Sequence, residues 1–131
     1  MDKEIEEKFV NTFIVKEKRK RIIFELCSNK KRGNAIQKLL GGLDDRYNVF
    51  RDRKVQEDEF LSVINRYFDI NKTCYVIADD SRNDGTVLPF KTAYNYMMES
   101  GSVYVLVCGD NLIIAKEEYC YDTTKLIYFK S

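Results

Sequence analysis

Apolar residues in the first half of the chain recur every three or four positions, which is the spacing of one face of a helix. Ile5, Phe9 and Phe13 follow this spacing, and Asp2 stands where its carboxylate can cap the first helical turn. The same spacing continues through most of the first seventy residues. It predicts three further helices, at about residues 17–27, 29–40 and 56–69.

The boundaries of the third predicted helix carry residues typical of helix ends. Ser28 is suited to cap its start, and the glycines at 41–42 can end it because glycine adopts the left-handed conformation freely. Residues 43–54 then form a polar connection that could include a short strand. Three residues are expected to hold this connection against the core: Tyr47, Val49 and Phe50.

The second half of the chain changes from helical spacing to short apolar segments typical of strands. Residues 73–78, 102–108 and 111–115 are apolar at odd and even positions alike, which predicts central strands covered on both faces. Residues 125–130 are flanked by lysines, a common feature of edge strands. Residues 108–111 read Cys-Gly-Asp-Asn and predict a tight hairpin turn.

A helix is predicted between the first two of these strands, from Pro89 to Ser100. Proline fits its first turn, and Phe90, Ala93 and Met97 would face the sheet. A strand, a helix and a second strand in this order imply a crossover, so we expect the strands at 73–78 and 102–108 to be parallel.

Together these elements predict an α+β fold with N-terminal helices packed on a mainly antiparallel sheet of about four strands, including one β-α-β crossover. A chain of 131 residues fits one domain, with residues 1–70 as a mainly helical half and 71–131 as a sheet half. No apolar run approaches the ~20 residues of a membrane span. The acidic start, MDKEIEEK, is unlike a secretory signal, so we expect a cytoplasmic protein.

The absence of histidine limits the chemistry that this chain can perform. Ser-His-Asp and Cys-His catalysis are excluded, because both need an imidazole as the general base. The four cysteines, Cys27, Cys74, Cys108 and Cys120, are too widely spaced for a typical zinc site. The first three lie in apolar segments and are expected to be buried free thiols. We therefore expect no cofactor and no enzymatic activity.

Positive charge is concentrated in one segment, residues 16–32, although the whole chain has a net charge of only +1. This segment has eight Lys or Arg residues against Glu17 and Glu25, a net charge of +6. We call the eight the basic patch: Lys16, Lys18, Arg19, Lys20, Arg21, Lys30, Lys31 and Arg32. We expect these side chains to face water and to be available to an acidic ligand. The alternative is a solvated face without a ligand, whose charges pair with the chain's own acidic residues, such as Glu4, Glu7 or Asp45.

The basic patch favours a binding function, for which two kinds of ligand remain open. An acidic protein could dock on it, because complementary charge accelerates encounter; a small regulatory or immunity-type protein would act in this way. Nucleic acid is the alternative, with an affinity that falls steeply with salt. Two tyrosines could add exposed contact area: Tyr119 and Tyr121. We expect the protein itself to be a monomer or a weak homodimer.

An acidic loop after the first strand suggests a third function, metal-assisted hydrolysis. Asp79, Asp80 and Asp84 could supply the oxygen ligands that Mg²⁺ prefers. The segment is equally typical of a polar turn, in which Asp80 or Asn83 bonds the backbone and Asp84-Gly85 completes the reversal.

Two segments carry a resemblance to known sequences: KEKRKRIIFELCSNKKR, which contains the basic patch, and the later TCYVIADDSRNDGTVLPFKTAYNYM. They resemble small, stand-alone bacterial proteins classed as hypothetical and uncharacterised, and the resemblance covers most of the chain. It implies a bacterial, cytoplasmic protein. It implies no activity and assigns no site residue.

Overall fold

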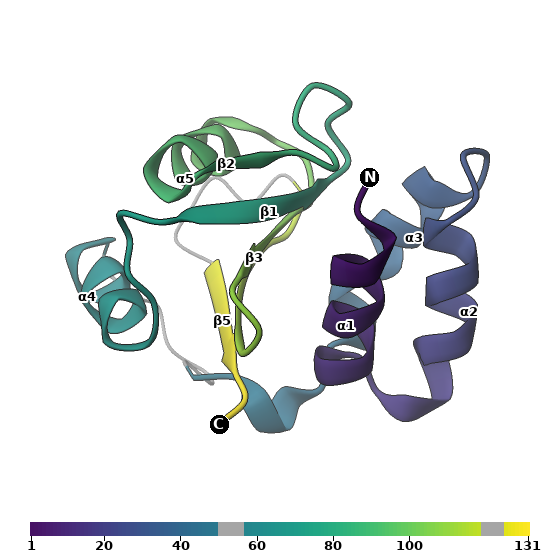
Figure 1. Cartoon of the computed structure of the whole chain (residues 1–131), viewed down its shortest axis with the longest axis horizontal. Coiled ribbons are helices and arrows are strands. Elements are labelled where there is room, and N and C mark those ends of the chain that lie inside the picture. Colours follow the sequence, from purple (N-terminus) through teal and green to yellow (C-terminus); the bar gives the residue numbers. More distant parts are fainter. Residues whose placement is uncertain (50–56, 119–124) are drawn as a thin grey trace.

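The computed structural model describes residues 1–49, 57–118 and 125–131. It has an α+β fold in three layers, with α1, α2 and α3 on one face of a sheet and α4 and α5 on the other (Figure 1). The predicted fold class is therefore confirmed. In chain order the elements are α1 (Lys3–Phe13), α2 (Lys16–Leu26), α3 (Arg32–Lys38), the 3-10 turns η1 (Leu40–Gly42) and η2 (Asp45–Tyr47), α4 (Glu57–Tyr67), β1 (Thr73–Ala78), β2 (Val87–Pro89), α5 (Phe90–Glu99), β3 (Tyr104–Cys108), β4 (Leu112–Lys116) and β5 (Lys125–Phe129).

The sheet is antiparallel, with the strand order β2-β1-β3-β4-β5. Within the described residues it has five strands instead of about four, because β2 was not predicted. β2 is only three residues long and ends at Pro89, which suits an edge strand since proline donates no ladder hydrogen bond. The segment at 125–130 forms the other edge, as predicted.

The crossover differs from the prediction in its first strand. β1 and β3 are antiparallel neighbours, so the expected parallel pair between them is wrong. The chain reverses once more at β2 before it enters α5. Since β2 and β3 both run antiparallel to β1, they are parallel to each other, and α5 connects them across β1.

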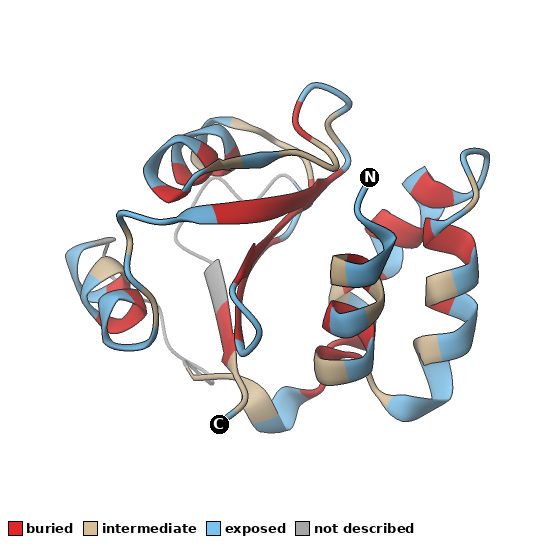
Figure 2. Cartoon of the chain, in the orientation of Figure 1, coloured by how far each residue is buried: buried red, intermediate tan, exposed pale blue. Residues whose placement is uncertain are grey.

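Apolar side chains on both sides of the sheet explain why its strands lack a polar face. Tyr75 and Ile77 of β1 belong to the core beneath α1–α3, whereas Cys74 and Val76 belong to the core beneath α4 and α5. β1, β3 and β4 are buried along almost their whole length, as Figure 2 shows for β1 and β3. The prediction of central strands covered on each face is confirmed.

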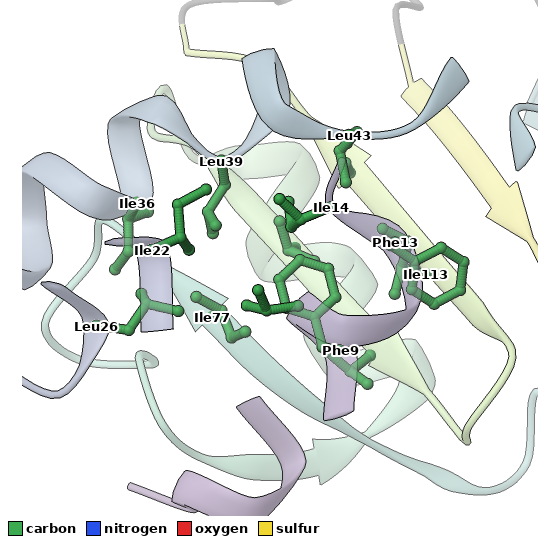
Figure 3. Packing of buried hydrophobic residues seen from close by; sticks show 14 of the residues in the cluster. Phe9, Phe13, Ile14, Ile22, Leu26, Ile36, Leu39, Leu43, Ile77 and Ile113 are labelled. Atoms are coloured by element: carbon green, nitrogen blue, oxygen red, sulfur yellow. The ribbon is translucent and has the colours of Figure 1, made fainter. Parts of the chain in front are cut away.

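The core beneath α1–α3 joins elements from both halves of the chain. Phe9, Phe13 and Ile14 of the first helix and its end pack near Ile77 and Ile113 of the sheet (Figure 3). Burial of each such side chain contributes about 1.5–3 kcal/mol to stability. These long-range contacts attach the N-terminal helices firmly to the sheet, and so give α2 and α3 a fixed position.

The first two helices match their predictions, and the third is shorter. The Asp2 carboxylate accepts a hydrogen bond from the Ile5 amide, 3.1 Å away, and caps α1. Before α3, Ser28 closes a turn by accepting hydrogen bonds from the amides of Lys31 and Arg32, so the helix begins only at Arg32. The expected left-handed stop at residues 41–42 is absent, and these glycines lie in η1.

Two glycines adopt positive φ angles within the described ranges, and both lie in turns. Gly109, at φ 72°, forms part of the turn between β3 and β4, which confirms the predicted hairpin. Gly85, at φ 76°, lies between β1 and β2. No helix in the described part of the chain is long and apolar enough to cross a membrane.

The connection after η1 reaches the far edge of the sheet. Tyr47 packs on the core beneath α1–α3, and Val49 packs on the opposite core. The Val49 amide donates to the Ile127 carbonyl of β5 at 2.8 Å, so the backbone here lies against the edge strand. Phe50, which was also expected to hold this connection, lies outside the described residues.

Candidate functional site

The basic patch divides into side chains that face solvent and side chains that do not. Arg19 is half-buried, and its Nε donates to the Ile14 carbonyl at 2.7 Å. Arg32 is buried, with only 5% of its surface exposed. The remaining six members are exposed: Lys16, Lys18, Lys20, Arg21, Lys30 and Lys31.

Arg32 lies inside an ionic network between the N-terminal helices and the sheet. Its two terminal nitrogens donate to the two carboxylate oxygens of Glu6 at 2.6 and 2.7 Å. On its other side, Nε and Nη2 donate to the carboxylate of Asp84 at 2.7 and 2.9 Å. A fifth hydrogen bond joins Nη1 to the Leu26 carbonyl at 3.0 Å. All five guanidinium donor directions are thus used within the molecule.

The electrostatics of this network keep Arg32 charged. Burial lowers the pKa of its guanidinium, but the hydrogen bonds to Asp84 and Glu6 outweigh this effect and raise the pKa above its ordinary value. Tyr75 completes the network by donating its hydroxyl to Glu6 at 2.6 Å. Burial and this bond raise the pKa of Tyr75. The expectation that Arg32 faces water is wrong, and its role is to bind α1, α3 and the loop after β1 together.

The sequence signal for this pairing was weak, because the partners are far apart along the chain. Glu6 lies 26 residues before Arg32, and Asp84 lies 52 residues after it. The expected acidic neighbours of the patch were Glu4, Glu7 and Asp45, all of which differ from the carboxylates that Arg32 binds. On α1, Glu6 is buried beside Phe9 and Val10, whereas Glu4 is exposed.

Phe24 is the main feature of the outward side of α2. It is 64% exposed, although it lies between the buried residues Ile22 and Leu26 in the sequence. Two residues along a helix correspond to about half a turn, so Phe24 points away from the core. Lys20 and Arg21, one turn earlier, lie beside it on the helix surface. The Lys31 ammonium lies 5.3 Å from the centre of the Phe24 ring, which is a cation–π contact.

We call Lys20, Arg21, Phe24 and Lys31 the α2 face. The sequence pattern was not used to identify Phe24 as a surface residue. The helical spacing of Ile22 and Leu26 already contains the signal, since both lie on the side of α2 that faces the core. Exposed aromatic side chains and arginine are the residue types enriched at protein interfaces.

A groove of about 350 Å³ lies next to the α2 face, between α2 and α3. We call it the α2–α3 groove. Its lining combines apolar residues with basic side chains: Ile22, Ala35, Gly41, Lys18, Arg21 and Lys38.

Two of the basic side chains of the groove have partners in the chain. Lys18 donates to the Gly41 carbonyl at 3.2 Å. Arg21 donates to Glu25 at 2.8 Å, and this bond lowers the pKa of the Glu25 carboxyl. Glu25 therefore stays ionised at neutral pH, and the groove with three cations and one carboxylate keeps a net positive charge.

The three aspartates after β1 do not converge on one point. Asp84 binds Arg32 and accepts the Ala78 amide at 3.2 Å. Asp79 accepts from the side-chain amide of Gln37. Within the described ranges, no group of three His, Cys, Asp or Glu residues could hold a metal ion.

Asp80 has its own separate partners. Its carboxylate binds Arg82 at 3.2 Å and accepts the Tyr104 hydroxyl at 2.6 Å. The bond to Arg82 lowers the pKa of Asp80, while burial and the bond to Asp80 raise the pKa of Tyr104 to about 12. The amides of Asn83 and Asp84 donate to the Asp80 carbonyl, at 3.0 and 2.9 Å. The loop has the contacts of the polar turn described above.

The cysteines occupy different environments. Cys74 and Cys108 are buried free thiols, as predicted, and the hydrogen bond between them together with burial raises the pKa of Cys108. Cys27 is exposed, which contradicts its predicted burial. Cys120, Tyr119 and Tyr121 lie outside the described residues.

A second groove, of about 220 Å³, lies between α1 and the sheet and includes Phe9, Tyr75 and Val87. Lys8 and Asp110 line it as an ion pair at 3.0 Å, so their charges cancel. The α2–α3 groove differs in keeping an excess of positive charge.

No protein-family model, no curated protein and no solved structure matches this chain.

Proposed function

We propose that this chain is a non-catalytic binding protein of the cytoplasm that recognises an acidic protein through the α2 face. A role as a small regulatory or immunity-type protein would follow, since such proteins act by occupying the surface of another macromolecule. The observation that carries the proposal is the exposed Phe24 ring among Lys20, Arg21 and Lys31.

The exposure of the Phe24 ring to water has a free-energy cost. Moving such a side chain from water into an apolar contact is favourable by about 1.5–3 kcal/mol. Nothing in α2 requires an aromatic residue there, because the core is filled by Ile22 and Leu26. Aromatic residues and arginine are enriched at the centres of protein interfaces, where they bury much area. A partner that covers Phe24 would gain this energy.

The surrounding charges favour an acidic partner over a neutral one. Lys20 and Lys31 are exposed beside the ring, and Arg21 retains donors beyond its bond to Glu25. Charges at the rim of an interface mainly increase the association rate and the selectivity. Carboxylates of the partner would meet these cations while an apolar pocket accepts Phe24.

The division of the basic patch into exposed and buried side chains favours a protein partner over nucleic acid. Arg32 is committed to Glu6 and Asp84, and Arg19 is half-buried, so two of the eight predicted cations do not face a duplex. Nucleic-acid affinity depends mainly on the number of phosphates neutralised. An exposed phenylalanine contributes more to a protein contact than to a phosphate backbone. Hydrolysis gains no support, because the three aspartates bind separate partners.

A photo-crosslinking experiment in the native host tests this proposal. The photoreactive residue p-benzoyl-phenylalanine replaces Phe24, which keeps an aromatic ring at the site. We expect a discrete protein adduct after irradiation. The yield of this adduct should fall by about tenfold or more when Lys20 and Lys31 are both changed to Glu. The attraction between these lysines and the acidic partner is then replaced by repulsion between like charges.

The matched control places the same photoreactive residue at Tyr96, an exposed aromatic position of α5 on the opposite side of the sheet. This position should give no such adduct. Nuclease treatment should leave the Phe24 adduct unchanged. An adduct that nuclease removes, or one that forms equally from Tyr96, would contradict the proposal.

A further inference from the structure

We propose that the α2–α3 groove holds an acidic segment of the partner protein and takes one aliphatic side chain of that segment. This inference rests on the proposed function and extends it, because it assigns the chemistry of the partner. The α2 face supplies Phe24 to the partner, and the groove accepts a side chain in return.

The shape of the groove carries the first part of the inference. Its volume of about 350 Å³ falls at the lower end of the ~300–1,000 Å³ that binding pockets enclose. Ile22 and Ala35 provide apolar lining from two different helices. Both helices are held by the buried core and by Arg32, so the groove is preformed and needs little ordering on binding.

Charge complementarity carries the second part. Lys18, Arg21 and Lys38 line the groove, and Glu25 is the single carboxylate among the described residues that line it. A neutral apolar segment would leave the excess positive charge of the groove without a compensating charge in the complex. A segment with Asp or Glu on either side of an aliphatic residue satisfies both the lining and the cations. The groove at α1 lacks this preference, because Lys8 there is paired with Asp110.

The α2–α3 groove is continuous with the α2 face, which is the third observation that supports the inference. Arg21 belongs to both the α2 face and the groove. It lies one turn before Phe24 on the helix surface. One partner could therefore contact Phe24 and the groove at the same time, and the two contacts would strengthen each other.

Gly41 provides a substitution that fills the groove without disturbing the core. A Cβ atom at this position has no heavy atom within 4 Å, and Gly41 does not have a positive φ angle. The variant Gly41→Leu therefore places an aliphatic side chain in open space at the groove. Gly33→Leu is the matched control, since Gly33 is exposed on α3, does not line the groove, and its added Cβ would lie 3.9 Å from Asp79.

The experiment measures binding of a short fluorescein-labelled peptide, rich in Asp and Glu with one central leucine, by fluorescence anisotropy. A second peptide carries alanine in place of leucine. We expect the leucine peptide to bind the wild-type protein about ten- to hundred-fold more tightly, the range expected for burying one such side chain. Gly41→Leu should remove this preference, and Gly33→Leu should retain it.

Lys38→Glu should weaken binding of both peptides, whereas Lys91→Glu, a reversal at an exposed position of α5, should not. Equal affinity for the leucine and alanine peptides would overturn the inference. So would wild-type binding by Gly41→Leu, or an equally charged single-stranded oligonucleotide that binds as tightly as the leucine peptide.

The failure of the groove and the failure of the α2 face can be told apart. Gly41→Leu is combined with the photoreactive residue at position 24. If the partner adduct still forms at full yield, the groove takes no part in recognition, while the proposed function stands. If no adduct forms even in the wild-type background, the proposed function itself fails.

Discussion

Lys31 and Arg32 are neighbours in the chain and carry the same charge, yet they have opposite roles. Lys31 is exposed and lies over the ring of Phe24. Arg32 is buried and binds two carboxylates beneath the N-terminal helices. The comparison shows that positively charged residues clustered in the sequence do not all share one environment. Lys31 precedes the first residue of α3 and faces solvent, whereas Arg32 begins α3 and is buried.

Removing Arg32 should have the largest effect on stability. The variant Arg32→Met leaves Glu6 and Asp84 without their counter-charge, and breaking a buried ion pair in this way costs about 3–5 kcal/mol. Lys31→Met should change the free energy of unfolding by less than about 0.5 kcal/mol, as for most surface positions. Urea unfolding followed by circular dichroism measures both. Equal effects of the two variants would show that the buried Arg32 contributes no more to stability than the exposed Lys31.

Glu6→Gln tests the same network from its other side, with a smaller expected effect. The amide keeps one oxygen acceptor but replaces the other with a donor that faces Arg32, so we expect a loss of about 1–3 kcal/mol. In a double-mutant cycle with Arg32→Met, the two losses should not add, with a coupling of about 0.5–3 kcal/mol. Glu4→Gln, at an exposed position on α1, is the control. Simple additivity would show that Glu6 and Arg32 do not interact.

Alkaline pH should weaken the buried network through Tyr75. The pKa of Tyr75 is raised in the folded protein, whereas an unfolded tyrosine titrates near 10. Stability from this group is therefore present below pH 10 and is lost as the pH rises from 10 towards the folded pKa, by about 1.4 kcal/mol for each unit of difference.

Tyr75→Phe should reduce this alkaline loss, at a cost of about 1 kcal/mol at neutral pH for the missing hydrogen bond. Tyr67→Phe, at an exposed position of α4, should leave the alkaline loss unchanged. Urea unfolding between pH 7 and 11 gives the comparison. The same pH dependence in Tyr75→Phe and wild type would argue against the bond to Glu6.

Phe24→Ala should have the smallest effect on stability. The ring is mostly exposed, so its removal should change the free energy of unfolding by less than about 0.5 kcal/mol. Urea unfolding followed by circular dichroism measures this change. A destabilisation similar to that of Arg32→Met would mean that Phe24 belongs to the core.

Local signals in the sequence predict much of this fold. The helices α1, α2, α4 and α5 and the central strands follow from spacing, caps and apolar runs, which act over a few residues. β2 was missed because three residues ending in proline carry little strand signal. Without β2, the direction of β3 relative to β1 was necessarily wrong, since one extra strand reverses the chain.

The candidate site was only partly predictable, for a related reason. Charge density singled out the segment at residues 16–32, and six of its eight basic side chains are exposed in the structure. The position of Arg32 depends on carboxylates far away in the sequence, which composition and spacing do not reveal. The exposure of Phe24, in contrast, follows from its offset of half a turn from Ile22 and Leu26, and a helical projection of α2 would have identified it.

The order of elements along the chain has a consequence for synthesis. Phe9, Phe13 and Ile14 are made early, but the strands that cover them, β3 and β4, are among the last elements to appear. Contacts between segments so distant in sequence slow folding. A nascent chain that has released only the first three helices therefore carries uncovered apolar stripes, the kind of surface on which chaperones act and aggregates begin.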